Sequence, residues 1–201
     1  MAFNIGTYNV RGLRDFSKRN TIFQFLRESS LNIICLQETH SEISDTKSWE
    51  AEWGAPIFFS HGTRQSSGIA ILLRDKYEIM NHENNIPGRM MTISINIQNQ
   101  LIAISNIYSP NKNEDQVQFY KKVYTILNTE FFRNTEIVLC GDFNLVLNST
   151  NDKKGGLIQN KSASKVLQEV IDDFNMQDLW RIKNPSKKEY TWSRPKHKIF
   201  L

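Results

Sequence analysis

The sequence predicts an α/β fold in which two mixed β-sheets pack together between layers of helices. Helical and strand-like segments alternate along all 201 residues without a Pro/Gly/Ser-rich linker or an internal repeat. Several strand candidates are apolar at every position, which is typical of strands buried on both faces. Consecutive strands in the middle of the chain are separated by short turns that suit antiparallel pairing. One domain covering residues 1–201 is therefore expected.

Three segments have helical periodicity. In residues 113–132, apolar side chains recur at alternating steps of three and four after a possible cap at Asn113. In residues 162–174, Ser162 can cap a helix whose apolar residues share one face. A less regular helix is predicted around residues 17–28. The apolar faces of the first two are Val117, Tyr120, Tyr124, Leu127 and Phe131, then Leu167, Val170, Ile171 and Phe174.

Strands are predicted wherever short apolar or alternating runs lie between turn-forming residues. The turns "RDK" and "QNQ" separate strand candidates closely enough for antiparallel hairpins. The predicted strands are residues 3–8, 32–36, 57–60, 68–73, 77–81, 91–97, 101–107 and 136–140.

The composition is that of an ordinary folded protein, with 39% hydrophobic and 23% charged residues. A formal charge of +4 and a pI of about 9.0 permit a polyanionic partner without requiring one. The sequence shows no secretory signal pattern and no apolar run near the roughly 20 residues of a membrane span. We therefore expect a nuclear or cytoplasmic location, without secretion or membrane insertion. Cys35 and Cys140 lie in apolar runs, which favours reduced core thiols.

Four apolar strand candidates end in polar groups suited to phosphate or metal chemistry. These groups are Asn9 in "IGTYNVRG", Glu38 in "IICLQETH", Tyr108 in "IAISNIYSPN", and Asp142 with Asn144 in "IVLCGDFN". Mg²⁺ prefers carboxylate oxygens and can neutralise charge that develops on a phosphate, so the set fits phosphodiester hydrolysis. A phenol, an amide and a second carboxylate can position the phosphate, the attacking water and the leaving oxygen.

Structural explanations exist for each residue taken singly. Asn9 can hydrogen-bond a turn before Gly12, and Gly141-Asp142-Phe143-Asn144 can be a simple turn. Tyr108 can be an aromatic residue at the rim of a strand end. The histidines at positions 40, 61 and 82 have no second histidine at metal-ligand spacing, and the four tryptophans fit core or interface anchors.

Taken together, the motifs "YNVRG", "LQETH", "SSGIAILL", "NIYSPN", "GDFN" and "YTWSRP" resemble the endonuclease/exonuclease/phosphatase superfamily. Within it, they most resemble the apurinic-endonuclease-like domain of LINE-type non-LTR retrotransposons. The resemblance spans nearly the whole chain. It implies a four-layer α/β sandwich and Mg²⁺-dependent nicking of one DNA strand, with Mn²⁺ as an alternative ion. The 3′-hydroxyl at the nick would prime the element's reverse transcriptase.

The resemblance also implies roles for individual residues. Glu38 would be the metal ligand with Asn9 beside it, Tyr108 would approach the scissile phosphate, Asp142 would handle the attacking water or the leaving group, and Asn144 would orient the phosphate. Thr191 matches a polar site residue of the retrotransposon subgroup. The segment "SRPKHK" takes the place of a hairpin loop that probes the minor groove, where Arg194, Lys196 and Lys198 suit phosphate contacts.

The C-terminal end departs from the family pattern. Family members continue beyond "YTW" through an Asp motif and a His motif, and that His is the general base that activates water. No residue here matches it, and His197 lies before the position of those motifs. We therefore expect a sandwich that lacks its last strands, and a possible loss of activity, because a positioned base is typically worth ~10²–10⁴-fold in rate.

Three functions are open at this point. The first is a monomeric retrotransposon endonuclease whose partners are double-stranded DNA and the reverse-transcriptase region of the same polyprotein. The second is a non-enzymatic relic that binds nucleic acid weakly through its basic surface. The third is another phosphoesterase of the superfamily, such as an abasic-site endonuclease or a phosphoinositide phosphatase.

Overall fold

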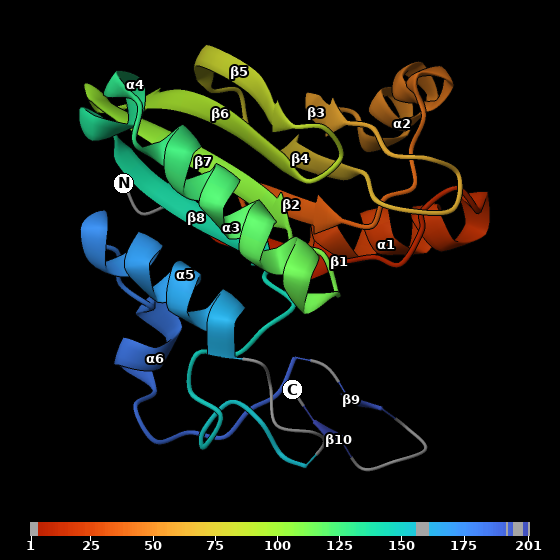
Figure 1. Ribbon diagram of the computed structural model, residues 1–201. Helices are drawn as coiled ribbons and strands as arrows, with labels where there is room; N and C mark the ends of the chain where they lie inside the picture. The colour runs from red at the N-terminus through yellow and green to blue at the C-terminus, as the bar shows by residue number, and fades with distance from the viewer. Residues whose placement is uncertain (1–3, 156–160, 192, 195–198, 201) are drawn as a thin grey trace. The chain divides into compact units, whose positions relative to one another are not determined.

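The computed structural model describes residues 4–155, 161–191, 193–194 and 199–200 (Figure 1). The chain divides into two compact units. The first unit contains Met1–Ser109 and Glu130–Asp142, and the second contains Pro110–Thr129 and Phe143–Leu201.

The first unit contains two four-stranded mixed sheets (Figure 1). The strand order is β1-β2-β4-β3 in the first sheet and β5-β6-β7-β8 in the second. Pairing is parallel between β1 and β2 and between β7 and β8, and antiparallel elsewhere. The strands are β1 (Ile5–Asn9), β2 (Ile33–Gln37), β3 (Ile57–Ser60), β4 (Ile69–Leu73), β5 (Glu78–Ile86), β6 (Met90–Ile97), β7 (Gln100–Tyr108) and β8 (Glu136–Asp142).

Strand β2 is buried at every position because its alternating side chains enter two different cores. Ile34 and Leu36 lie in a core with side chains of the helices α1 (Phe16–Glu28) and α2 (Thr46–Trp53). Ile33 and Cys35 lie in the core between the two sheets, with Met91 and Ile104 of the second sheet. The first unit thus has a helical layer on one sheet and a second sheet on the other face.

The sequence explains where helix α1 begins and where helix α2 ends. At the start of α1, the Asp15 carboxylate accepts a hydrogen bond from the Lys18 N–H at 2.8 Å. Helix α2, which the sequence did not predict, ends at Gly54 with a φ of 80°. Trp49 and Trp53 of this helix are buried in the core, as expected for core anchors.

One expected hairpin is absent from the first unit. The turn at residues 74–76 joins β4 to β5, and these strands belong to different sheets, so they do not pair. The length of a turn does not tell to which sheet the next strand belongs. The turn at Gln98 and Asn99 does form a hairpin between β6 and β7. Its φ values of 53° and 65° are the positive values that a two-residue hairpin turn of type I′ requires at both positions.

The predicted helix over residues 113–132 is also wrong in extent. Helix α3 (Asn113–Leu127) stops where the Asn128 N–H bonds to the Tyr124 carbonyl at 3.0 Å, and a separate short helix, α4 (Glu130–Arg133), follows. Periodicity reports which face is apolar, not where the backbone hydrogen bonds stop. For the same reason the predicted caps are shifted: Lys112 precedes α3, and Ser162 lies inside α5 (Lys161–Asp173).

Helices are the main regular structure in the described part of the second unit. Helices α3 and α5 contact each other, and the Tyr124 hydroxyl donates to the Asp173 carboxylate at 2.8 Å. On α5, Leu167 and Val170 are buried, as the predicted apolar face requires. The unit also contains the short helix α6 (Leu179–Lys183) and two short antiparallel strands, β9 (Ser193–Arg194) and β10 (Ile199–Phe200).

The two cysteines are free thiols, as expected. Cys140 of β8 donates a hydrogen bond to Cys35 of β2, with 3.4 Å between the sulfur atoms. This hydrogen bond and burial raise the pKa of the Cys35 thiol. Cys35 therefore stays protonated near neutral pH and is not a nucleophile.

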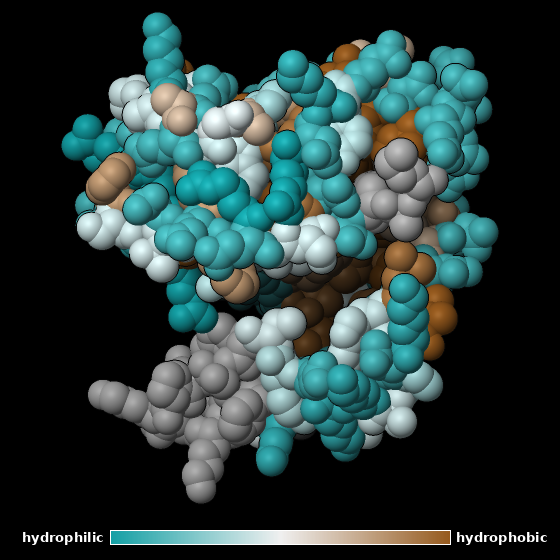
Figure 2. Space-filling model, turned by 180° about the vertical axis from the view of Figure 1, so that it is seen from behind, coloured by the Kyte–Doolittle hydropathy of each residue, from teal (hydrophilic) through white to brown (hydrophobic). Residues whose placement is uncertain are grey.

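Hydrophilic residues cover much of the face that Figure 2 presents. Exposed apolar side chains include Phe16 and Phe25 on α1 and Leu179 on α6. Within the residues that the structure describes, no helix is both long and apolar enough to cross a membrane.

A buried polar network joins the two sheets. Gln37 of β2 and Asn106 of β7 are almost fully buried, and the Gln37 amide donates to the Asn106 carbonyl oxygen at 2.7 Å. The Asn106 amide donates to the main-chain oxygens of Leu36 and Ala70 at 3.0 and 2.9 Å. The Gln37 amide also donates to the Thr7 hydroxyl at 2.9 Å. Hydrogen bonds are directional, so this network fixes one arrangement of the sheets in an otherwise apolar interface.

Replacing Asn106 by alanine should lower the free energy of unfolding by about 2–4 kcal/mol, because it leaves buried donors and acceptors unpaired. Urea unfolding of the full chain measures this loss. The control is Ser94→Ala on β6: the Ser94 hydroxyl is buried with no hydrogen-bond partner among the described residues, so its removal should cost nothing. Equal losses in the two variants would contradict a special role for the network.

Candidate active site

The carboxyl ends of both parallel strand pairs meet at one edge of the two sheets. Strands β1 and β2 end at Asn9 and Gln37, and strands β7 and β8 end at Tyr108 and Asp142. The edge strands β1 and β8 are in contact. Residues that end these strands, or directly follow them, are therefore brought together although up to 133 positions separate them in the sequence.

Asn9 links the two carboxylates of this edge. Its side-chain amide nitrogen donates to Glu38 Oε1 and to Asp142 Oδ2, each at 2.8 Å. The Tyr108 hydroxyl donates to the same Glu38 oxygen at 2.8 Å. Four of the residues predicted from the sequence thus form one hydrogen-bonded group, which we call the site group: Asn9, Glu38, Tyr108 and Asp142.

The backbone at Glu38 is held in a left-handed conformation. Its φ is +54°, and Arg11 on the neighbouring loop has a φ of +48°. The Gly12 N–H donates to the Glu38 carbonyl at 2.6 Å, and the Arg11 N–H donates to Asn9 Oδ1 at 3.1 Å. Such conformations are unfavourable for residues with a Cβ and persist only where the surroundings impose them, often at functional sites. Both loops that present Asn9 and Glu38 therefore contain a residue in this unfavourable conformation.

Glycine at position 141 permits β8 to deliver Asp142. Its φ is +137°, and a Cβ there would lie 2.0 Å from the Ile107 carbonyl oxygen of β7. The register pairs Ile107 with Gly141 and Tyr108 with Asp142. The "GD" in "CGDFN" therefore reflects the close approach of two backbones directly before the site.

Tyr108 is a protonated phenol near neutral pH. Burial, followed by the hydrogen bond to Glu38, raises the pKa of Tyr108 to about 12. The phenol is therefore a hydrogen-bond donor at this edge and not a base.

Sequence reasoning missed one neighbour of the site group. The guanidinium of Arg89 lies 4.4 Å from the centre of the Tyr108 ring, in a cation–π contact. Arg89 stands in the turn between β5 and β6. No local pattern marks it, because its contact with Tyr108 depends on the pairing of β6 with β7.

The residues at this edge fit a hard divalent cation. Glu38 uses Oε1 to accept both hydrogen bonds, and no hydrogen bond from the described residues reaches its other carboxylate oxygen. Asp142 supplies a second carboxylate. Within the described part of the chain, no group of three or more His, Cys, Asp or Glu side chains could hold a metal. A site with few protein ligands suits Mg²⁺, which keeps several waters.

The remaining predicted residues belong to the second unit or lie outside the description. Asn144 has a φ of +49°, and its carbonyl accepts a hydrogen bond from the Gln116 side chain at 2.8 Å. Thr191 is exposed. Arg194 lies on β9, which pairs antiparallel with β10, and its side chain is not among the described parts of the chain. Lys196 and Lys198 lie outside the described residues.

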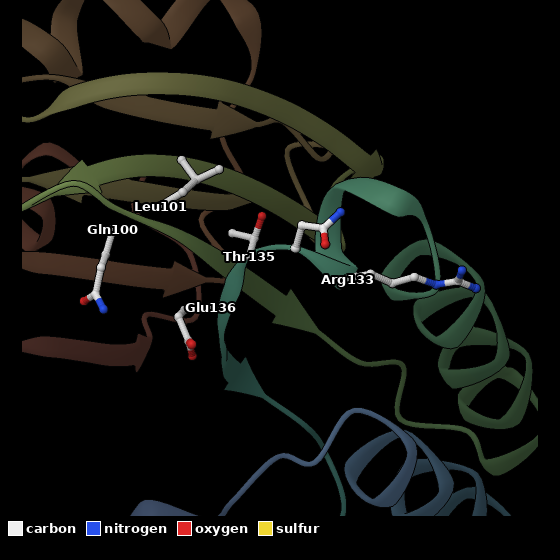
Figure 3. Close-up of a pocket in the computed structure, with 6 residues that line it drawn as sticks. Gln100, Leu101, Arg133, Thr135 and Glu136 are labelled. Atoms are coloured by element: carbon white, nitrogen blue, oxygen red, sulfur yellow. The ribbon is translucent and has the colours of Figure 1, made fainter.

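A pocket lies at the end of the second sheet opposite the site group (Figure 3). Its labelled side chains come from the beginning of β7, from α4, from Thr135 between α4 and β8, and from the beginning of β8. It has no residue in common with the site group. The pocket is lined by Gln100, Leu101, Arg133, Asn134, Thr135 and Glu136.

A family model described as the Endonuclease/Exonuclease/phosphatase family matches residues 6–195. The chain is 28% identical over 196 residues to the "Transposon TX1 uncharacterized 149 kDa protein" of Xenopus laevis. The match covers 96% of this chain and 15% of the transposon protein, so the chain corresponds to a small part of that relative.

Solved structures share the fold. An AP endonuclease from Archaeoglobus fulgidus superposes with a TM-score of 0.78 at 20% identity, covering 98% of this chain and 80% of the endonuclease. A 3′ phosphatase from Neisseria, bound to product DNA hairpin, gives a TM-score of 0.74 at 18% identity with the same coverage. The predicted α/β fold, with two mixed sheets flanked by helices, is thereby confirmed.

Proposed function

Because the chain belongs to the endonuclease/exonuclease/phosphatase family, we propose that it is a divalent-metal-dependent endonuclease that nicks one strand of double-stranded DNA. The observation that carries this proposal is the site group, in which one amide of Asn9 joins the carboxylates of Glu38 and Asp142 at 2.8 Å each. Paired carboxylates beside a phenol donor suit hydrolysis of a phosphodiester.

Glu38, with Asn9 beside it, would hold Mg²⁺ or Mn²⁺ through the carboxylate oxygen that carries no hydrogen bond from the described residues. The bound ion supplies positive charge against the developing charge of the phosphate. Asn9 keeps the two carboxylates at fixed positions by donating to both. These positions are set before substrate binds, which lowers the reorganisation needed during reaction.

Asp142 would orient the attacking water or the leaving oxygen through its carboxylate. When substrate binds, Tyr108 would donate its hydroxyl hydrogen to a phosphate oxygen in place of Glu38, and its raised pKa of about 12 keeps that hydrogen on the phenol at neutral pH. Asn144 would orient the phosphate. Thr191, Arg194, Lys196 and Lys198 would contact the DNA outside the cleaved bond, where basic side chains bind phosphates.

The similarity to a Xenopus transposon protein supports a role in transposition. We propose that the nick leaves a 3′-hydroxyl that primes reverse transcription, carried out by another region of the same polyprotein. Action on chromosomal DNA would place the chain in the nucleus, and we propose that it acts there as a monomer. The similarity to an AP endonuclease fold makes abasic DNA the alternative substrate.

Conversion of supercoiled plasmid to nicked circles tests the proposal. The chain is incubated with Mg²⁺, with Mn²⁺ or with a chelator, beside Asp142→Asn. We expect nicking only with metal, and a loss of about 10²-fold or more in Asp142→Asn. Asp75→Asn is the control, since Asp75 is an exposed carboxylate just beyond the far end of β4.

Absence of metal-dependent nicking by a folded preparation would overturn the proposal and favour a DNA-binding relic. Oligonucleotide duplexes with and without one abasic site separate the two substrates. Faster cleavage of the intact duplex supports a transposition endonuclease. Cleavage confined to the abasic duplex would instead make the chain an abasic-site enzyme.

A further inference from the structure

Arg89 and Tyr108 make three non-covalent contacts with each other. The Arg89 carbonyl accepts the Tyr108 N–H at 2.8 Å, and Arg89 Nη1 donates to the Tyr108 carbonyl at 3.3 Å. The guanidinium stacks 4.4 Å from the centre of the Tyr108 ring. Since the hydroxyl of the same ring contacts Glu38, the guanidinium lies one side chain away from the Glu38 carboxylate of the site group.

The charge of Arg89 is not neutralised by a carboxylate of the described residues. Two other half-buried or buried arginines of the first unit are ion-paired: Arg14 lies 2.7 Å from Asp45, and Arg19 lies 2.6 Å from Glu52. Arg89 is half-buried yet forms no ion pair with any described residue. Its hydrogen bonds to the described residues use only one of the five N–H donors of a guanidinium.

A guanidinium whose donors are mostly free of protein partners can pair with an anionic ligand. A phosphate fits because its oxygens match the planar fork of a guanidinium and form charge-assisted hydrogen bonds. The two carboxylates of the site group would repel a phosphate, and a fixed cation beside Tyr108 offsets part of that repulsion.

We propose that Arg89 binds a non-bridging oxygen of a phosphate of the cleaved DNA strand, at or next to the bond that is broken. This inference rests on the proposed function, because it takes DNA as the substrate. Arg89 thus contacts substrate directly, and its stacking on Tyr108 holds the guanidinium where the phosphate enters.

Salt-dependent DNA binding tests the contact without requiring cleavage. Anisotropy of a labelled duplex is measured over a series of KCl concentrations in EDTA. In Arg89→Ala, we expect affinity about tenfold lower near ~0.1 M salt. The slope of log K against log salt should fall by about 0.9, the value for one lost phosphate contact. Arg89→Lys retains the charge and should keep the slope of the unmodified chain.

Arg74→Ala is the matched control. Arg74 follows β4 at the end away from Glu38 and likewise donates to main-chain carbonyls, those of Arg27 and Ser29. This variant loses one positive charge but should keep the slope. Circular dichroism and the thermal midpoint establish that each variant is folded.

An unchanged slope in folded Arg89→Ala overturns the proposal, even if affinity falls, since a purely structural role lowers affinity without removing a phosphate contact. If the unmodified chain nicks DNA and the slope is unchanged, only the Arg89 proposal fails. If binding depends on Arg89 but the chain does not nick, the phosphate contact stands, whereas the cleavage proposal fails together with the placement of that phosphate beside a broken bond. A chain that binds no duplex at any salt concentration overturns both.

Discussion

Replacing Glu38 by glutamine should lower the rate of metal-dependent nicking by about 10³-fold while leaving the fold intact. Glutamine has the shape of glutamate, and its carbonyl oxygen can accept the bonds from Asn9 and Tyr108 that Glu38 Oε1 accepts. The charge that would bind the cation is lost, and with it the electrostatic stabilisation of the phosphate, which is typically worth several kcal/mol.

Plasmid nicking over a range of Mg²⁺ concentrations measures this effect, with the thermal midpoint as the check on folding. Glu28→Gln is the control, because Glu28 is an exposed carboxylate that ends α1 and bonds only to Gln24 among the described residues. If Glu38→Gln nicks within threefold of the unmodified chain, Glu38 is not the metal ligand and the cation binds elsewhere.

Replacing Gly141 by alanine should lower the free energy of unfolding by about 3 kcal/mol or more. The added Cβ would lie 2.0 Å from the Ile107 carbonyl oxygen and 2.8 Å from the Ile107 nitrogen, both backbone atoms. Backbone cannot move aside without breaking the parallel pairing of β7 with β8. The positive φ adds its own penalty for a residue with a Cβ.

Gly54→Ala separates the penalty of a positive φ from that of crowding. Gly54 ends α2 with a φ of +80°, and nothing lies within 4 Å of the position of its Cβ. We expect about 1 kcal/mol there, from φ alone. Chemical unfolding of both variants gives the two losses in free energy of unfolding. If the loss for Gly141→Ala is no larger than that for Gly54→Ala, the backbones of β7 and β8 can move apart at little energetic cost, which contradicts the prediction.

Much of the fold was predictable because its strands carry local signals. The run "IICLQ" lies between turn residues and is buried on both faces, and the predicted β2 differs from the observed one by a single residue at each end. The α2 segment "TKSWEAEW" was missed, since its apolar residues are few and its ends carry no strong cap pattern apart from Gly54. The pairing of β4 with β2 and β3, not with β5, depends on contacts that no local pattern encodes.

The candidate site was predictable to a similar extent. Asn9, Glu38, Tyr108 and Asp142 stand out because polar groups end or follow apolar strands, and the sheets then place them together. Arg89 has no such signal: it lies 19 residues before Tyr108, in a turn, and only the register of β6 and β7 brings the two into contact. Sequence patterns therefore identify residues positioned by strand ends more readily than those positioned by pairing.

The bonds between Gln37 and Asn106 have a consequence for how such a protein loses activity over evolutionary time. Asn9 and Glu38 are presented by the first sheet, and Tyr108 and Asp142 by the second, so the site depends on the alignment of two separately hydrogen-bonded sheets. An apolar interface alone is non-directional and would tolerate a small shift between them. A substitution at Asn106 can therefore abolish activity although every residue of the site group remains. An intact set of motifs in a related sequence thus does not by itself identify an active copy.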